Sequence, residues 1–369
     1  MNDNNLGLYI HIPFCKSKCS YCDFVSFADS TTLHKHYIDM LLNEMDNVFD
    51  EFRDGEKRVV DTIFIGGGTP SVLYKGALKQ LKNHIFNSGA FHFVKDLEFT
   101  VEANPESCNE GFVKECVQIG VNRLSLGLQS SHDRLLKDLR QHSFDDFIKA
   151  VSLARKYKIH NINADIMLGL PFQTIEDVLN TIDELIKLDM HHISMYGLKI
   201  EEGTLLYNSG YEPDEDMTAQ MYMSAYDRLK AVGYLRYEVS NFAKKGFECR
   251  HNKKYWRLDD YIGVGLNASS LYNGVRKKNT YNMNQYLKGD FLSELEDADN
   301  NFLTEYLMLG LRTTEGIDLG LLKLKGINLF KNEKLYHFIN NGIMIMRNNR
   351  LKIADEYYYV MNSIISELI

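Results

Sequence analysis

The sequence predicts an α/β fold in which parallel strands alternate with helices and curl into a partial or complete barrel. The prediction rests on six apolar segments rich in Val, Ile, Phe and Tyr, whose starts lie 26 to 52 residues apart. Antiparallel hairpins need only a few residues between strands, whereas a crossover through a helix needs a dozen or more. The segments begin near Leu8, Val60, Leu97, Arg123, Ile162 and His192.

Helical patterns fill the gaps between these segments. Apolar residues recur at helical spacing over 37–48, 113–120 and 178–186. Each pattern is an amphipathic helix that lies between two predicted strands, so the βα unit repeats along the first half of the chain.

The pattern changes after about residue 215. A long helix is predicted over 217–231, then an apolar segment at 234–239 and an irregular stretch to about residue 300. Helical segments from Phe302 precede a hairpin of 343–346 with 351–353, and a last helix over 355–367. We therefore expect a core at 1–235, a connecting region at 236–300, and a C-terminal, mostly helical winged-helix-like domain at 301–369.

Charge and composition exclude some partners. Lys and Arg total 42 against 50 Asp and Glu, and residues 301–369 carry a net charge of only +1 (eight basic, seven acidic), so nucleic acid is not an expected ligand. No apolar stretch reaches the length of a transmembrane segment, and the N-terminus lacks the pattern of a signal peptide. A cytoplasmic location is expected, where thiols stay reduced.

Three of the six cysteines are clustered directly after the first predicted strand. Cys15, Cys19 and Cys22 form a C-x3-C-x2-C pattern, whose spacing lets one loop turn three thiolates toward one centre. Iron–sulfur cubanes usually take four cysteines, so three would leave one iron open to a small molecule. Zinc is the alternative, with His11 as a fourth ligand, although His11 lies within the strand.

Polar residues also occur at the ends of other predicted strands. Gly66-Gly67-Gly68-Thr69-Pro70 ends the second strand, where glycines let the backbone approach a ligand closely. Glu102, Gln129 and Asp165 each lie near the end of a separate strand. The carboxyl ends of parallel barrel strands carry the active site, so these side chains are candidate ligand contacts. The alternative for each is a solvated loop residue or a tight turn.

A family resemblance adds to this interpretation. Tyr9-Ile-His11-Ile-Pro-Phe-Cys15-x3-Cys19-x-Tyr21-Cys22 resembles the signature of radical S-adenosyl-L-methionine (SAM) enzymes, specifically the oxygen-independent coproporphyrinogen III oxidase family. Further motifs follow in the order of that family: Gly66–Ser71, Val101–Pro105, Gly127–Ser130, Asp165–Pro171, Glu202–Thr204, His251–Trp256 and Leu309–Gly316. The resemblance covers nearly the whole chain and implies a radical SAM partial (β/α)6 barrel.

One position separates the branches of that family. Oxidases resemble C-x3-C-x2-C-x-C, whereas this chain has Phe24 at the place of the fourth cysteine. Phe24, together with the His-Asn-x2-Tyr-Trp motif, resembles the HemW-type branch, whose members are regarded as haem chaperones. Oxygen-independent decarboxylation of coproporphyrinogen III is the alternative function, and a zinc-stabilised binding module is a third. The chain also departs from its relatives at Gly263–Ser270, where family members more often have Gly-x-Gly-Pro-Gly-Ala.

The resemblance implies a set of ligands and partners. Cys15, Cys19 and Cys22 would hold a 4Fe–4S cluster, and His251 is the candidate haem ligand. The alternative for His251 is a core histidine beside a packed Tyr255-Trp256 pair. Haem, a haem-acceptor protein and, if radical chemistry occurs, an electron donor are the implied partners. The residues implied to contact SAM are Tyr9, Tyr21, Gly67, Gly68, Thr69, Glu102, Gln129, Arg140 and Asp165.

Overall fold

The structure is a computed structural model that describes residues 5–28, 30–53, 57–137, 139 and 142–369. Six parallel strands lie side by side in chain order, and each coincides with one of the six predicted segments. The predicted parallel α/β fold is therefore confirmed. The strands are β1 (Leu6–Ile12), β4 (Arg58–Gly67), β5 (Phe91–Ala103), β6 (Arg123–Gln129), β7 (Asn161–Leu168) and β8 (His192–Gly197).

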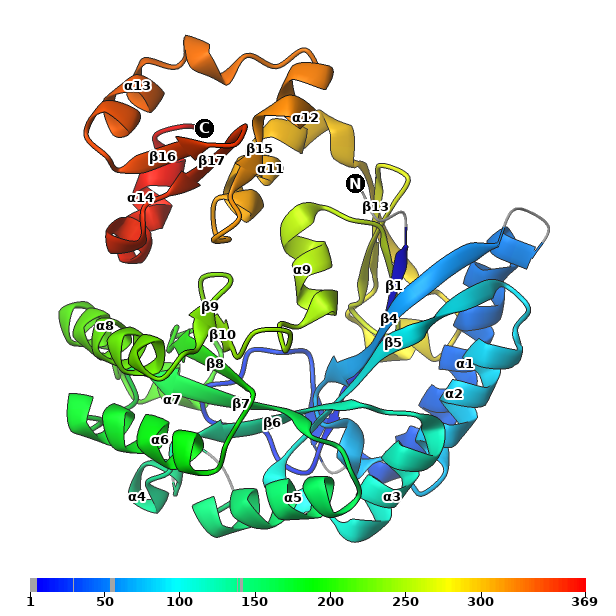
Figure 1. Cartoon of the computed structure of the whole chain (residues 1–369). Helices are drawn as coiled ribbons and strands as arrows, with labels where there is room; N and C mark the ends of the chain where they lie inside the picture. The colour runs from blue at the N-terminus through cyan, green and yellow to red at the C-terminus, as the bar shows by residue number, and fades with distance from the viewer. Residues whose placement is uncertain (1–4, 29, 54–56, 138, 140–141) are drawn as a thin grey trace.

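The barrel is open, because its first and last strands do not pair with each other. β1 pairs on its outer side with β11 (Tyr261–Val264), and β8 pairs with β10 (Asn241–Ala243). Helices cover the outer face of the sheet, as Figure 1 shows. They include α1 (Thr31–Arg53), α2 (Ala77–Asn87), α3 (Glu110–Ile119), α5 (Phe144–Lys156), α6 (Ile175–Lys187) and α8 (Glu215–Ala231).

The expected connecting region extends both edges of this sheet. The first expected boundary, at residue 235, falls within β9 (Leu235–Arg236), which pairs with β10. On the opposite edge, three antiparallel strands follow β11: β12 (Ser269–Tyr272), β13 (Val275–Asn279) and β14 (Leu292–Asp297). The prediction of an irregular stretch was wrong for these segments, because short strands with many polar residues show little apolar patterning.

The altered glycine motif packs at the edge where β11 meets β1. Gly265 has φ +105°, and a Cβ there would lie 2.6 Å from the His11 carbonyl oxygen. The Gly265 amide donates to Glu44 Oε2 at 2.8 Å, and Asn279 and Tyr286 also donate to this buried carboxylate. The loop is therefore a packing element behind β1.

The C-terminal part has its own apolar core, which includes Leu307, Leu335 and Leu351. Its helices α11 (Phe302–Gly310), α12 (Leu319–Leu324) and α13 (Glu333–Asn340) precede a hairpin of β16 (Met344–Arg347) and β17 (Arg350–Ile353). The hairpin is at the predicted place, and β15 (Ile317–Asp318) adds a third strand. The predicted last helix is divided into a 3-10 turn, Asp355–Val360, and α14 (Met361–Ser366).

A buried arginine connects the C-terminal part to the barrel. The Arg236 guanidinium lies 3.6 Å from the ring centre of Tyr358 and 4.7 Å from that of Tyr226. It also pairs with Asp355 at 3.1 Å. Cation–π contacts of this kind strengthen when they are removed from water.

Over the described residues, no helix is long and apolar enough to be a candidate membrane span.

Stability should fall with rising pH because of Glu238, which lies beside this junction. Burial raises the pKa of the Glu238 carboxyl from 4.5 to about 7, so the unfolded chain ionises first as the pH rises between these values. The unfolded state then binds fewer protons, and the free energy of unfolding declines by about 3 kcal/mol across that window. Denaturant unfolding at pH 5 and at pH 8 measures this decline in the free energy of unfolding. Glu238→Gln should remove most of it. The exposed Glu212→Gln is the control, and an unchanged pH dependence in Glu238→Gln would contradict the assignment.

Candidate functional site

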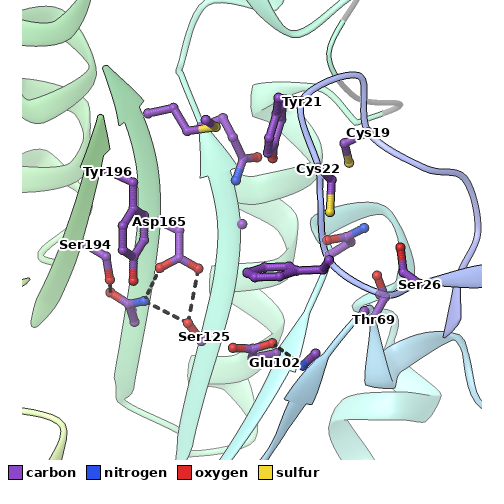
Figure 2. A pocket seen from close by; sticks show the side chains of 18 of the residues that line it. Cys19, Tyr21, Cys22, Ser26, Thr69, Glu102, Ser125, Asp165, Ser194 and Tyr196 are labelled. Atoms are coloured by element: carbon purple, nitrogen blue, oxygen red, sulfur yellow. Dashed lines mark hydrogen bonds between the residues drawn. The ribbon is translucent and has the colours of Figure 1, made fainter. Parts of the chain in front are cut away.

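A cavity of about 630 Å³ occupies the inside of the open barrel. Figure 2 shows the labelled cysteines on one side of it and Asp165, Ser194 and Tyr196 on the other. Twelve of the thirteen predicted site residues line this cavity, and the thirteenth, Arg140, lies outside the described residues. The twelve are Tyr9, Cys15, Cys19, Tyr21, Cys22, Gly67, Gly68, Thr69, Glu102, Gln129, Asp165 and His251.

The cysteine loop is fixed at several points along its length. Its start is β2 (Phe14–Cys15), which pairs in parallel with β3 (Phe27–Ala28). Within the loop, the Cys22 amide donates to the Cys19 carbonyl at 3.2 Å, and the Ser20 carbonyl accepts from the Leu206 amide at 2.8 Å. The Thr69 hydroxyl donates to Cys15 Sγ at 3.6 Å, which joins this loop to the glycine segment.

The three thiols are close enough to influence one another electrostatically. The pKa of Cys22 is raised, first by burial and then by the negative charges of Cys19 and Cys15, although a backbone hydrogen bond at Phe24 opposes the rise. Thiolates that repel one another in a half-buried loop are stabilised together by a cationic metal centre, because metal binding releases their protons. The donor set therefore fits an iron–sulfur cluster.

The arrangement gives no support to a zinc site that includes His11. Within the described ranges, no three His, Cys, Asp or Glu side chains lie at the spacing that a single metal ion requires. The His11 Nδ1 instead forms a 2.9 Å hydrogen bond with the Tyr9 hydroxyl. A single zinc ion needs all its ligands around one point, whereas in a cubane each cysteine binds a different iron.

The glycine segment is packed against the chain itself. Gly67 has φ +113°, and a Cβ there would lie 2.5 Å from the His11 ring; one on Gly68 would lie 2.6 Å from the Phe14 carbonyl oxygen. The Gly67 amide donates to Glu102 Oε2 at 2.9 Å. The sequence interpretation explained these glycines by close approach of a ligand. Their close neighbours in the structure are protein atoms, although Gly67 and Gly68 also line the cavity.

Gln129 and Asp165 present acceptor oxygens to the cavity. Gln129 has φ +64°, an uncommon conformation for a residue other than glycine, at the end of β6. Its side chain is buried, and its Oε1 atom has no hydrogen-bond partner among the described residues. Asp165 accepts from Asn163 at 2.7 Å and from Ser125 at 3.3 Å (Figure 2). An acceptor left unpaired in a cavity fits a ligand that carries hydroxyl or amino donors, as SAM does.

His251 lies at the floor of the cavity on helix α9 (Arg250–Arg257). Its Nδ1 atom bonds to the Thr62 hydroxyl and its Nε2 atom to the Tyr255 hydroxyl, both at 2.8 Å. Burial, followed by the charges of Lys254 and Arg123, lowers the pKa of His251 to about 3, so the imidazole is neutral. Both ring nitrogens are engaged, so iron could bind Nε2 only after the Tyr255 hydroxyl moved.

A carboxylate on the barrel holds the beginning of helix α9. The Glu98 carboxylate accepts hydrogen bonds from the Arg250 and His251 amides, each at 3.0 Å. Its negative charge is also stabilised there, because the N-terminus is the positive end of the helix dipole. Cys249 donates to the same carboxylate at 3.6 Å, and burial raises the pKa of its thiol to about 12. Cys108 and Cys116 are buried, as expected for inert thiols.

Several cavity residues were not predicted as candidates. On three strands, polar residues occur at every second position and so face the inside of the barrel. This alternation is visible in the sequence and could have predicted them. The additional polar lining residues on these strands include Arg123 and Ser125 on β6, Asn163 on β7, and Ser194 and Tyr196 on β8.

Comparisons with known proteins give consistent results. The Radical SAM superfamily profile matches residues 9–185. The chain is 33% identical to the heme chaperone HemW of Lactococcus lactis, over 98% of this chain and 96% of that protein. It is 37% identical to the heme chaperone HemW of Escherichia coli, over 80% of this chain and 79% of that protein. Among solved structures, coproporphyrinogen III oxidase (HemN) from Escherichia coli matches 99% of this chain and 90% of its own, with a TM-score of 0.85 at 20% identity.

Proposed function

Because the chain belongs to the HemW family of the radical SAM superfamily, we propose that it binds a 4Fe–4S cluster, SAM and haem and transfers haem to an acceptor protein. The observation that carries the proposal is the single cavity that collects the three cysteines and the residues expected to contact SAM. The acceptor protein and an electron donor are proposed partners, and the cytoplasm is the proposed location.

Different residues of the cavity would hold the cluster and contact SAM. Cys15, Cys19 and Cys22 would hold the cluster, with Thr69 orienting Cys15 through its hydroxyl. Glu102, Gln129 and Asp165 would accept hydrogen bonds from the donors of SAM. When bound, the cluster and SAM supply one-electron chemistry, and the barrel walls exclude water from it.

Phe24 favours the chaperone over the oxidase. Its side chain lines the cavity and is 62% exposed, and it provides no thiol at the position where oxidases carry a fourth cysteine. The remaining described cysteines, Cys108, Cys116 and Cys249, are buried and are not among the residues that line the cavity.

The test is an anaerobic purification followed by two assays. We expect iron and sulfide in equal amounts, a Soret band when haem is added, and no protoporphyrinogen from coproporphyrinogen III with SAM and a reductant. Decarboxylated product over many turnovers would contradict the chaperone and favour the oxidase. A colourless protein without iron would contradict both and favour a zinc-stabilised module.

Haem ligation by His251 has a specific consequence for its neighbour. If iron binds Nε2, Tyr255→Phe removes a competing hydrogen bond and should tighten haem binding by about two- to tenfold. His251→Ala should weaken haem binding and diminish the Soret band, whereas the exposed His160→Ala should change neither. Titrations followed by absorbance measure both effects. If haem binding is unchanged in Tyr255→Phe and in His251→Ala, and only His251→Ala is less stable, His251 has a packing role and is not a haem ligand.

A further inference from the structure

The floor of the cavity contains a buried cation. Arg123 lies at the start of β6, lines the cavity and is only 1% exposed. A guanidinium carries five N–H donors, and the Arg123 Nε–H has no hydrogen-bond partner within the part of the chain that the structure describes. A buried donor without a partner is costly, and buried arginines are normally hydrogen-bonded.

The neutral polar groups around Arg123 are already engaged with one another. Asn163 donates to Ser125 Oγ at 2.8 Å and to Asp165 at 2.7 Å. Its amide oxygen accepts from Ser194 and is bonded to His192 Nδ1. His251 uses both ring nitrogens. This network fixes the floor without involving the guanidinium.

The two nearby carboxylates are engaged elsewhere as well. Glu98 accepts from two amides of helix α9, and Asp165 accepts from Ser125 and Asn163. Burial alone would lower the pKa of Arg123, but the electrostatic influence of nearby groups raises it above its ordinary value. These groups, in order of effect, are Cys249, Glu98, Tyr237 and Asp165. Arg123 therefore lines the cavity as a charged side chain whose Nε–H lacks a partner among the described residues.

Arg123 is far along the strand from Gln129, although its neighbour Asp165 is also an expected SAM contact. Arg123 and Gln129 lie at opposite ends of β6, and six residues of strand span about 20 Å. A molecule bound at the cysteines and Gln129 therefore lies at the other end of the lumen. A cavity of about 630 Å³ is within the usual range for small-molecule sites and extends to both ends of this strand.

We propose that Arg123 anchors a carboxylate of a second ligand, which reaches the cavity floor while SAM occupies the cysteine end. Guanidinium and carboxylate match in geometry and charge, and their hydrogen bonds are the strong, charge-assisted kind. This inference rests on the proposed function, under which the carboxylate is a propionate arm of haem.

The experiment compares haemin with its dimethyl ester, in which both carboxylates are blocked. The cluster-loaded wild-type protein should bind haemin about 10- to 100-fold more tightly than the ester. Arg123→Gln should abolish this preference by weakening haemin alone, and Arg123→Lys should retain part of it. The exposed Arg228→Gln is the control and should behave as wild type. Affinity for SAM and cluster content should be the same in all four proteins.

Each alternative outcome is distinguishable. Equal wild-type affinities for haemin and its ester would overturn the inference and leave the proposed function intact, even if every Arg123 variant failed to fold. An undiminished preference in Arg123→Gln would also overturn it, as would a loss of SAM affinity as large as the loss for haemin, which would assign Arg123 to SAM. Failure of the wild type to bind either porphyrin would overturn the proposed function together with the inference.

Discussion

Cys19→Ala should abolish the iron–sulfur cluster. Cys19 is one of three half-buried thiols that line the cavity, and the remaining two leave the cluster one protein ligand short. We expect iron and sulfide to fall together by at least about tenfold, and the brown absorbance to disappear. Anaerobic iron and sulfide analysis measures the effect.

A matched control is available in the same chain. Cys108→Ala removes a buried thiol that is not among the cavity-lining residues, and burial raises the pKa of that thiol to about 12. This variant should keep the cluster. A full cluster in Cys19→Ala, or the same loss in both variants, would show that the cluster ligands are wrongly assigned.

Gly67→Ala should eliminate SAM binding and destabilise the fold. Alanine at φ +113° is strained, and its Cβ would lie 2.5 Å from the buried His11 ring. Displacing that ring disturbs its hydrogen bond with Tyr9, and a shift of the backbone at residue 67 disturbs the hydrogen bond from the Gly67 amide to Glu102. We expect a loss of about 3 kcal/mol in the free energy of unfolding, and a fall in SAM affinity of at least about 100-fold. Denaturant unfolding and equilibrium dialysis with SAM measure the two effects.

Gly76→Ala separates backbone strain from packing. Gly76 has a similar conformation, φ +94°, but a Cβ there would meet nothing within 4 Å. Its substitution should cost only about 1 kcal/mol and leave SAM binding unchanged. Equal effects of the two substitutions would mean that strain alone, and not the contact with His11, makes glycine necessary at position 67.

The repeated strands and the site were predictable for different reasons. The six barrel strands are buried and apolar, so composition and spacing revealed them. The cavity could be predicted because its motifs follow strand ends, and parallel strands bring those ends to one side. The roles of the individual site residues remain predictions.

The features that were missed depend on long-range contacts. β11 pairs with β1 across some 250 residues of chain, and nothing local in a four-residue strand predicts such a partner. The same applies to the proposed role of Arg123, which rests on neighbouring groups from β5, β7 and the start of helix α9. The 3-10 turn over Asp355–Val360 continues directly into α14 at Met361, so the sequence offered no boundary between them.

Helix α9 lies at the end of the barrel where the strands begin. Its residues His251, Asn252 and Tyr255 line the cavity there and close that end. Figure 1 shows this helix between the barrel and the C-terminal part. Because these residues line the amino end of the cavity, a ligand would enter and leave at the carboxyl ends of the strands. If a second ligand reaches Arg123 as proposed, it lies deeper in the cavity than a molecule bound at the cysteines, and its release would require that molecule to leave first.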